Sequence, residues 1–146
     1  MAHASKTIVV NVTPEQFFDV ITDYQKYPEF LPEVKKTTVS GTPPDAEVTY
    51  TIDIKAKTIT YTVKMQAARP RELAWNMIRG EMMKENKGTW RLKPMATGTE
   101  VTYDIDLKLG ALVPGFIEKA LAEQSLPTML ANFKNRAEKL YPKATV

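Results

Sequence analysis

One short segment decides how the chain begins to fold: Tyr27-Pro28-Glu29-Phe30-Leu31-Pro32. Each proline pushes the residue before it towards extended backbone, so a first helix ends near Tyr27 and a second, short one ends before Leu31. Upstream, Thr13-Pro14-Glu15-Gln16 is a capping box that starts the first helix, with proline at its first position. Residues 5–12 are rich in β-branched side chains and predict a strand. The sequence therefore predicts two small helices between the first and second strands.

Further along the chain, the hydrophobic period changes to two between Val34 and Leu109. Apolar and polar side chains alternate in residues 48–55, 58–65 and 101–109. Such alternation is typical of antiparallel strands with one apolar face and one solvent face. Turn sequences separate the strands at 41–45, 69–71, 79–81 and 96–98. The pattern predicts an antiparallel sheet of six or seven strands.

The apolar face of this sheet needs a cover, and residues 114–141 supply one. Their apolar side chains recur at helical spacing, and most charged ones fall on the opposite side. Pro127 removes one backbone hydrogen bond, so the helix should kink or split there. We expect a single domain over residues 1–146, ordered from about 5 to 142.

Composition excludes several classes of function. The chain of 146 residues has no cysteine and one histidine, His3, which we expect in a frayed N-terminal tail. We therefore expect no metal site, no Ser-His-Asp triad and no cofactor. A net charge of +3 is too small to indicate DNA as a partner. The chain lacks a signal-peptide pattern and a run long enough to span a bilayer, so we predict a cytoplasmic protein. The gate described below would add peripheral contact at the inner membrane.

The element order β-α-α-β(6)-α resembles the helix-grip fold of the START-like superfamily, an α+β fold whose curved antiparallel sheet wraps around a long C-terminal helix. Phe17-Phe18-Asp19-Val20-Ile21-Thr22-Asp23-Tyr24, followed by the proline-rich segment above, is similar to the opening of the polyketide cyclase/coenzyme-Q-binding branch. That branch also includes ribosome-association toxins. The similarity continues in residues 80–84 and 88–92 and in Leu126-Pro127. It implies a hydrophobic cavity between sheet and helix, but members differ in what they bind there.

The side chains predicted to line this cavity are apolar or aromatic and occupy inward positions. They are Tyr61, Met65, Trp75, Met77, Trp90, Tyr103 and Ile105 from the sheet, and Phe116, Leu121, Met129, Leu130 and Phe133 from the helix. The alternative is that they form ordinary core. The tyrosine hydroxyls could bond a quinone carbonyl or a backbone group. Inward positions of the three alternating strands hold no carboxylate, lysine or arginine, so no catalytic residue is predicted and binding is favoured over catalysis.

A second candidate site is a gate at the cavity entrance. The apolar segment 109–117 joins the last strand to the long helix, and Tyr27 and Phe30 could lie near the same opening. With Leu112 and Val113 they would form a membrane contact that lets a lipid enter. The alternative is a lid folded back on the domain.

Three functions remain open on the sequence alone. The first is a carrier or chaperone that binds a hydrophobic small molecule, an isoprenoid quinone or lipid, and passes it to a respiratory-chain partner. The second is a ribosome- or protein-binding module that uses scattered basic residues such as Lys87 and Arg91. The third is a polyketide cyclase/aromatase-like enzyme. Trp75→Ala should abolish lipid retention in the first case, leave partner binding intact in the second and slow turnover in the third.

Overall fold

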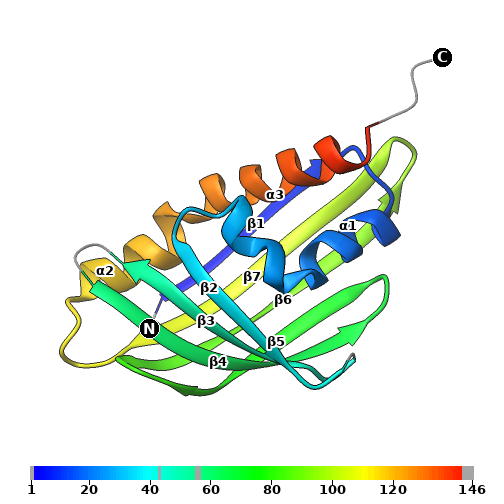
Figure 1. Ribbon diagram of the computed structural model, residues 1–146. Coiled ribbons are helices and arrows are strands. Elements are labelled where there is room, and N and C mark those ends of the chain that lie inside the picture. The colour runs from blue at the N-terminus through cyan, green and yellow to red at the C-terminus, as the bar shows by residue number, and fades with distance from the viewer. Residues whose placement is uncertain (1, 43, 55–56, 143–146) are drawn as a thin grey trace.

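One seven-stranded antiparallel sheet forms the body of the protein, with the strand order β1-β7-β6-β5-β4-β3-β2. The structure is a computed structural model and describes residues 2–42, 44–54 and 57–142. The strands are β1 (Ala2–Val10), β2 (Val34–Ser40), β3 (Glu47–Ile54), β4 (Lys57–Ala68), β5 (Glu72–Gly80), β6 (Met83–Met95) and β7 (Gly98–Leu109). The sheet curves around the C-terminal helices (Figure 1), which confirms the predicted α+β helix-grip fold.

The connection from β1 to β2 contains the two predicted helices, α1 (Pro14–Thr22) and the 3-10 helix η1 (Tyr24–Glu29). The capping box forms as expected: the Thr13 hydroxyl accepts the backbone N–H of Gln16 at 3.2 Å, and the Gln16 side chain accepts the N–H of Thr13 at 3.0 Å. The boundary predicted near Tyr27 was wrong, because Tyr27 and Pro28 both lie within η1. The tighter 3-10 geometry accommodates a proline there.

The N-terminal strand begins earlier than predicted. Its pairing with β7 already starts at Ala2, opposite Leu107. His3 therefore belongs to the sheet instead of a frayed tail, and its Nδ1 lies 2.8 Å from the Asp106 carboxylate on the neighbouring strand. The β-ladder holds the first residues in place, which local sequence could not indicate.

The C-terminal helix is divided, as Pro127 predicted. It consists of α2 (Gly115–Lys119), one π-helical turn, η2 (Ala120–Gln124), and α3 (Leu126–Leu140). The N–H of Ser125 bonds the carbonyl of Ala120 at 2.9 Å, which is the wide spacing of a π turn. Pro127 follows in the first turn of α3, where a missing N–H costs least.

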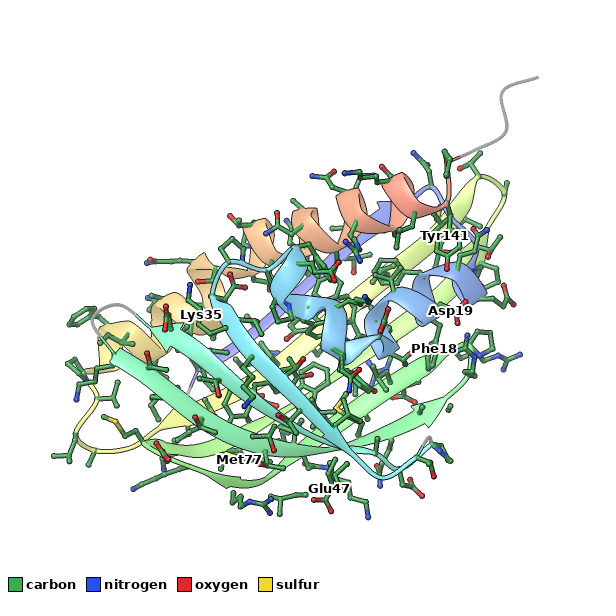
Figure 2. The ribbon with its side chains drawn as sticks, viewed as in Figure 1. Phe18, Asp19, Lys35, Glu47, Met77 and Tyr141 are labelled. Carbon is green, nitrogen blue, oxygen red and sulfur yellow. The ribbon has the colours of Figure 1, made fainter. Side chains whose placement is uncertain are left out.

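Helix α1 closes one end of the core. Phe17 and Phe18 are completely buried. Figure 2 shows Phe18 and Asp19 side by side on α1. Arg69, from the turn between β4 and β5, bonds the Asp19 carboxylate and places its guanidinium 4.8 Å from the centre of the Phe18 ring. This contact attaches α1 to the sheet. The cavity described below is lined by η1 and the C-terminal helices, and not by α1.

Candidate functional site

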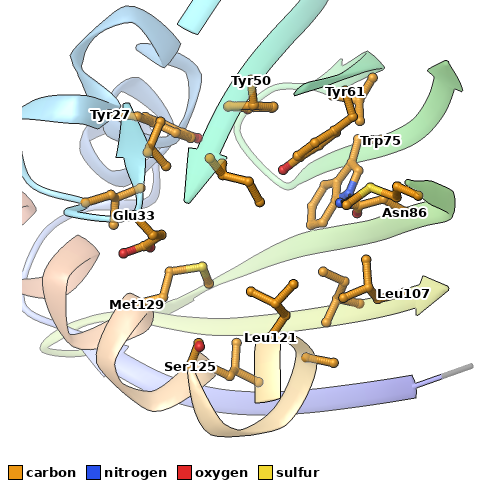
Figure 3. Close-up of a pocket in the computed structure, with 18 of the residues that line it drawn as sticks. Tyr27, Glu33, Tyr50, Tyr61, Trp75, Asn86, Leu107, Leu121, Ser125 and Met129 are labelled. Carbon is orange, nitrogen blue, oxygen red and sulfur yellow. Dashed lines mark hydrogen bonds between the residues drawn. The ribbon is translucent and has the colours of Figure 1, made fainter. Parts of the chain in front are cut away.

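A cavity lies between the curved sheet and the divided helix (Figure 3). Its volume is about 300 Å³, near the lower end of the range for small-molecule sites and enough for about ten water molecules. Strands β2 to β7 contribute to its wall, as do η1, the loop after it, and the segments α2, η2 and α3. The sheet thus provides one half of the lining and the helices the other.

A series of aromatic rings follows the side of the cavity next to η1. Phe133 of α3 meets the ring of Tyr27 edge-on, with centroids 5.2 Å apart. Tyr27 stacks on Tyr50 at 6.0 Å, and Tyr50 contacts Tyr61 at 5.4 Å. Pairs of this kind contribute about 0.5–1.5 kcal/mol each beyond their buried area. They hold three tyrosines from η1, β3 and β4 in fixed positions.

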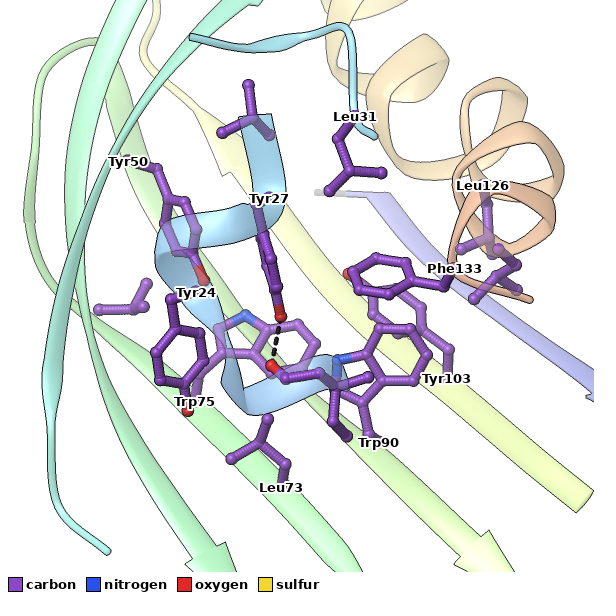
Figure 4. Close-up of a cluster of buried hydrophobic side chains, with 14 of the residues drawn as sticks. Tyr24, Tyr27, Leu31, Tyr50, Leu73, Trp75, Trp90, Tyr103, Leu126 and Phe133 are labelled. Atoms are coloured by element: carbon purple, nitrogen blue, oxygen red, sulfur yellow. Dashed lines mark hydrogen bonds between the residues drawn. The ribbon is translucent and has the colours of Figure 1, made fainter. Parts of the chain in front are cut away.

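A second aromatic series starts from the same phenylalanine and follows the other side. Phe133 contacts Trp90 at 4.9 Å, Trp90 contacts Tyr103 at 4.7 Å, and Tyr103 lies 5.4 Å from Trp75. Figure 4 shows these rings within one cluster of buried side chains. All the rings of the two series line the cavity.

Asn86 closes the gap between the ends of the two series. Its carbonyl oxygen accepts the indole N–H of Trp75 at 2.9 Å, and its side chain hydrogen-bonds Tyr61. Gly88, two residues further on β6, makes room for the indole, since a Cβ there would lie 2.4 Å from a ring carbon of Trp75. We call the closed set of Tyr27, Tyr50, Tyr61, Trp75, Asn86, Trp90, Tyr103 and Phe133 the aromatic belt.

Two hydroxyls of the belt are available for a ligand. Tyr27 donates to the backbone carbonyl of Ile21 and is satisfied within the protein. Tyr50 and Tyr103 are 8% and 7% exposed and line the cavity. Neither hydroxyl bonds a protein group within the described residues, where the one fully enclosed side-chain oxygen without a partner is that of Thr89. Burial raises the pKa of both phenols well above the usual value, so both stay protonated at neutral pH and can donate.

The solvent side of the cavity carries the only charged lining residues in the described ranges, Glu33 and Asp53. Both are half-buried, and the Glu33 carbonyl accepts the N–H of Asp53 at 2.8 Å. Met129 of α3 and the exposed Ser125 at the helix break line the same cavity from the helix side, and Figure 3 labels both together with Glu33. We call this rim of Glu33, Asp53, Ser125 and Met129 the mouth.

Nine of the twelve predicted lining residues surround the cavity. They are Tyr61, Met65, Trp75, Trp90, Tyr103, Ile105, Leu121, Met129 and Phe133. The structure thus brings together inward positions from four strands and both parts of the helix. Whether they bind a ligand stays a prediction.

Three predicted lining residues lie elsewhere. Met77 is beyond Trp75 on β5, where its sulfur packs beside Gly80. Leu130 is fully buried in the core, because it is turned by about 100° around α3 from its neighbour Met129. Phe116 is 65% exposed in the first turn of α2. Its neighbour Ile117 lines the cavity instead.

The predicted gate residues separate into buried and exposed ones. Tyr27 is buried in the aromatic belt and Val113 packs into the core, so neither can touch a membrane directly. Phe30 is half-buried, lies against Phe133 and carries the Arg136 guanidinium 5.2 Å from its ring centre. Leu112, in contrast, is 87% exposed. The loop therefore folds back at Val113 and projects at Leu112.

Sequence reasoning missed Asn86 and the acidic mouth. Asn86 lies between charged residues, and such a sequence is typical of a surface turn. On β6, however, it is two positions from Gly88 and four from the inward Trp90. Period two along β6 could therefore have found it. Asp53 was assigned to the solvent face, and Glu33 lies in a loop without any period. The sequence around Asp53 and Glu33 therefore does not predict that either residue lines a cavity.

Neither a metal centre nor a membrane span emerges from the described residues. No group of three or more His, Cys, Asp or Glu side chains there could hold a metal ion. Within the same ranges, no helix is long and apolar enough to cross a bilayer. The residues that line the cavity provide apolar contact, hydrogen bonding from tyrosines, and the charge of the mouth.

Comparison with known proteins agrees with the arrangement of sheet and helices. Residues 1–138 match the family described as polyketide cyclase / dehydrase and lipid transport. The chain belongs to this family. It is 26% identical to the ribosome association toxin RatA of Escherichia coli, over 97% of this chain and 90% of that protein. Its fold is that of a START superfamily protein from Mycobacterium smegmatis, with a TM-score of 0.83 at 20% identity, covering 94% of this chain and 98% of that one. It is also that of the Zhui aromatase/cyclase from a Streptomyces species, with a TM-score of 0.81 at 16% identity and 99% of both chains.

Proposed function

We propose that the protein binds a neutral hydrophobic small molecule, an isoprenoid quinone or a similar lipid, as a carrier or chaperone without covalent chemistry. The observation that carries this proposal is the cavity of about 300 Å³ lined by the phenols of Tyr50 and Tyr103, whose hydroxyls bond no protein group within the described residues. Hydroxyls inside an apolar cavity are normally hydrogen-bonded, and a ligand carbonyl would accept from these two. The match to a family that includes lipid transport supports the same function.

Affinity would come from the apolar wall and orientation from the tyrosines. Burial of apolar ligand surface contributes about 25 cal/mol per Å², before the cost of ordering the ligand. The cavity can accept one ring and part of a chain, so a long isoprenoid tail would extend through the mouth. The cyclase alternative needs a general base inside the cavity. The buried tyrosines resist ionisation, and the carboxylates of Glu33 and Asp53 stand at the rim.

The test is extraction of the purified protein with organic solvent and mass spectrometry of the extract, beside an equally treated unrelated protein. A quinone or lipid in stoichiometric amount is the expected result. Titration with a decyl-substituted benzoquinone then measures affinity through the two tryptophans, both of which line the cavity. Tyr50→Phe and Tyr103→Phe should each weaken binding several-fold, whereas the control Tyr141→Phe lies outside the cavity and should not. Equal affinity in all three variants would contradict the proposal.

Delivery at a membrane would use the projecting loop before α2. Leu112 and Phe116 are 87% and 65% exposed, and Lys108 and Lys119 beside them suit anionic lipid. Leu112→Asp should reduce binding to anionic vesicles without loss of stability. Leu140→Asp is the matched control, since Leu140 is also exposed but lies at the far end of α3 (Figure 1). Unchanged binding of Leu112→Asp would refute the membrane contact.

A ribosome-binding role is the second candidate, and the resemblance to the ribosome association toxin favours it. The basic residues that we considered for it are engaged: Arg91 lies 3.7 Å from Glu72 and 3.5 Å from Asp104, and Lys87 lies 3.4 Å from Glu85. Co-sedimentation with ribosomes at low and high salt tests this role. Salt-sensitive pelleting that Arg91→Glu abolishes would support it, and absence of pelleting at low salt would rule it out.

A further inference from the structure

The mouth has a charge that bears on which ligands can enter. Glu33 and Asp53 are both part of the lining, and no lysine, arginine or histidine lines the cavity in the described part of the chain. The two carboxylates differ in their surroundings. Asp53 lies 3.4 Å from Lys35 and accepts the Thr58 hydroxyl at 2.9 Å. Glu33 has no ion-pair partner among the described residues, so the rim keeps a net negative charge.

The interior offers hydrogen bonds to a neutral acceptor. Tyr50 and Tyr103 are more than nine-tenths buried, both line the cavity, and neither hydroxyl bonds a protein group in the described part of the chain. A carboxylate head would also accept these bonds, but it would enter without any cation to compensate its charge. Its route inward would pass Glu33, and like charges within about 10 Å at an effective dielectric of about 20 disfavour binding by roughly tenfold.

We propose that the cavity is selective for uncharged and cationic amphiphiles, and that Glu33 excludes anionic ones such as fatty acids. This inference rests on the proposed function and states which charges a ligand of the cavity can carry. Glu33 acts here as a specificity residue: a neutral ketone, quinone or alcohol passes it without penalty, and an amine gains from it. Because Asp53 is already paired with Lys35, Glu33 supplies most of the effect.

The experiment compares four probes with the same tail: decyl-benzoquinone, decanol, decylamine and decanoate. Binding is followed through the tryptophan fluorescence of the full chain at low ionic strength. In the unaltered protein, decanoate should bind about tenfold more weakly than decanol, and decylamine at least as tightly as decanol. Decylamine is needed because desolvation alone would weaken both charged probes, whereas a carboxylate at the mouth weakens only the anion.

Variants then assign the effect to one residue. Glu33→Gln should bring decanoate to within about threefold of decanol, and Glu33→Lys should reverse the order of decanoate and decylamine. The control Glu15→Gln removes the same charge from an exposed position on α1 that does not line the cavity, and should leave the ratios unchanged.

The outcomes separate this inference from the proposed function. If decanol and the quinone bind and decanoate binds as tightly, the charge selection is wrong and the cavity is still a ligand site. If decanoate is excluded equally from the unaltered protein and from Glu33→Gln, the role of Glu33 is wrong. If none of the four probes binds, the proposed function fails and the inference fails with it. The comparison of probes in the unaltered protein holds even if a variant does not fold.

Discussion

Gly88 should tolerate no side chain, although its backbone conformation is an ordinary one for a strand. An added Cβ would lie 2.2 Å from the carbonyl oxygen of Asp104 on β7 and 2.4 Å from the indole of Trp75 on β5. The indole can turn only by giving up its bond to Asn86, and the carbonyl belongs to the sheet backbone. Overpacking of this kind costs about 1–3 kcal/mol, and two clashes place Gly88→Ala at the upper end, about 3 kcal/mol.

Urea unfolding and thermal melting measure this cost. With about 3 °C per kcal/mol for a chain of this length, Gly88→Ala should lower Tm by about 9 °C. Gly115→Ala is the matched control, because nothing lies within 4 Å of a Cβ at that position in α2. It should be neutral or slightly stabilising. The near-ultraviolet circular dichroism of Trp75 should change in Gly88→Ala alone. If Gly88→Ala melted within about 2 °C of the control, the tight contact between β5, β6 and β7 would be wrong, and with it the explanation of how Trp75 is positioned.

Three further perturbations test the belt and its supports. Phe133→Ala removes the ring shared by both aromatic series and should cost about 3–5 kcal/mol in urea unfolding; a cost under about 1 kcal/mol would contradict its place in the core. A hydrogen bond from Arg136 lowers the pKa of Glu29, so this pair contributes stability above the ordinary pKa of 4.5 that is lost as pH falls through the folded value. Glu29→Gln should flatten this acid-side loss in unfolding experiments between pH 3 and 6, and an unchanged slope would refute it. Burial raises the pKa of the Tyr50 and Tyr103 phenols, so their contribution to stability is complete below the usual 10.0 and declines as pH rises beyond it. Phenolate absorbance should rise at higher pH in the native protein than in urea, and coincident curves would show that these phenols are not buried.

The sheet and its cover could be predicted because each depends on local periodicity. In β3, β4 and β7, alternation indicates which face is buried, and after residue 114 the helical spacing does the same. The capping box indicates where α1 begins. The break in the C-terminal helix followed from Pro127 alone. The early start of β1 could not be predicted in this way, because Ala2 and His3 are held by β7, more than a hundred residues away.

The site residues could be predicted where the side chains follow these periods. They could not be predicted where the position depends on the extent of the cavity or on a loop. Trp75, Trp90 and Tyr103 were assigned inward from alternation and lie in the belt. Met77 has the same alternation, but the cavity ends before it. Glu33 has no period to follow, and its place at the mouth results from the loop that carries the chain from η1 into β2.

The pairing of β1 with β7 has a consequence for how the chain is made. The first strand has its partner only when residues 99–107 have been synthesised. At about 5–20 residues per second, Ile8 and Val10 wait roughly 5–20 s for the strand that covers them. Contacts so distant in sequence also slow folding, since a long loop must close before they form. The sheet therefore cannot be completed from its N-terminus, and a chain stalled before β7 would leave β1 unpaired and its apolar end, Ile8 to Val10, uncovered for as long as the stall lasts.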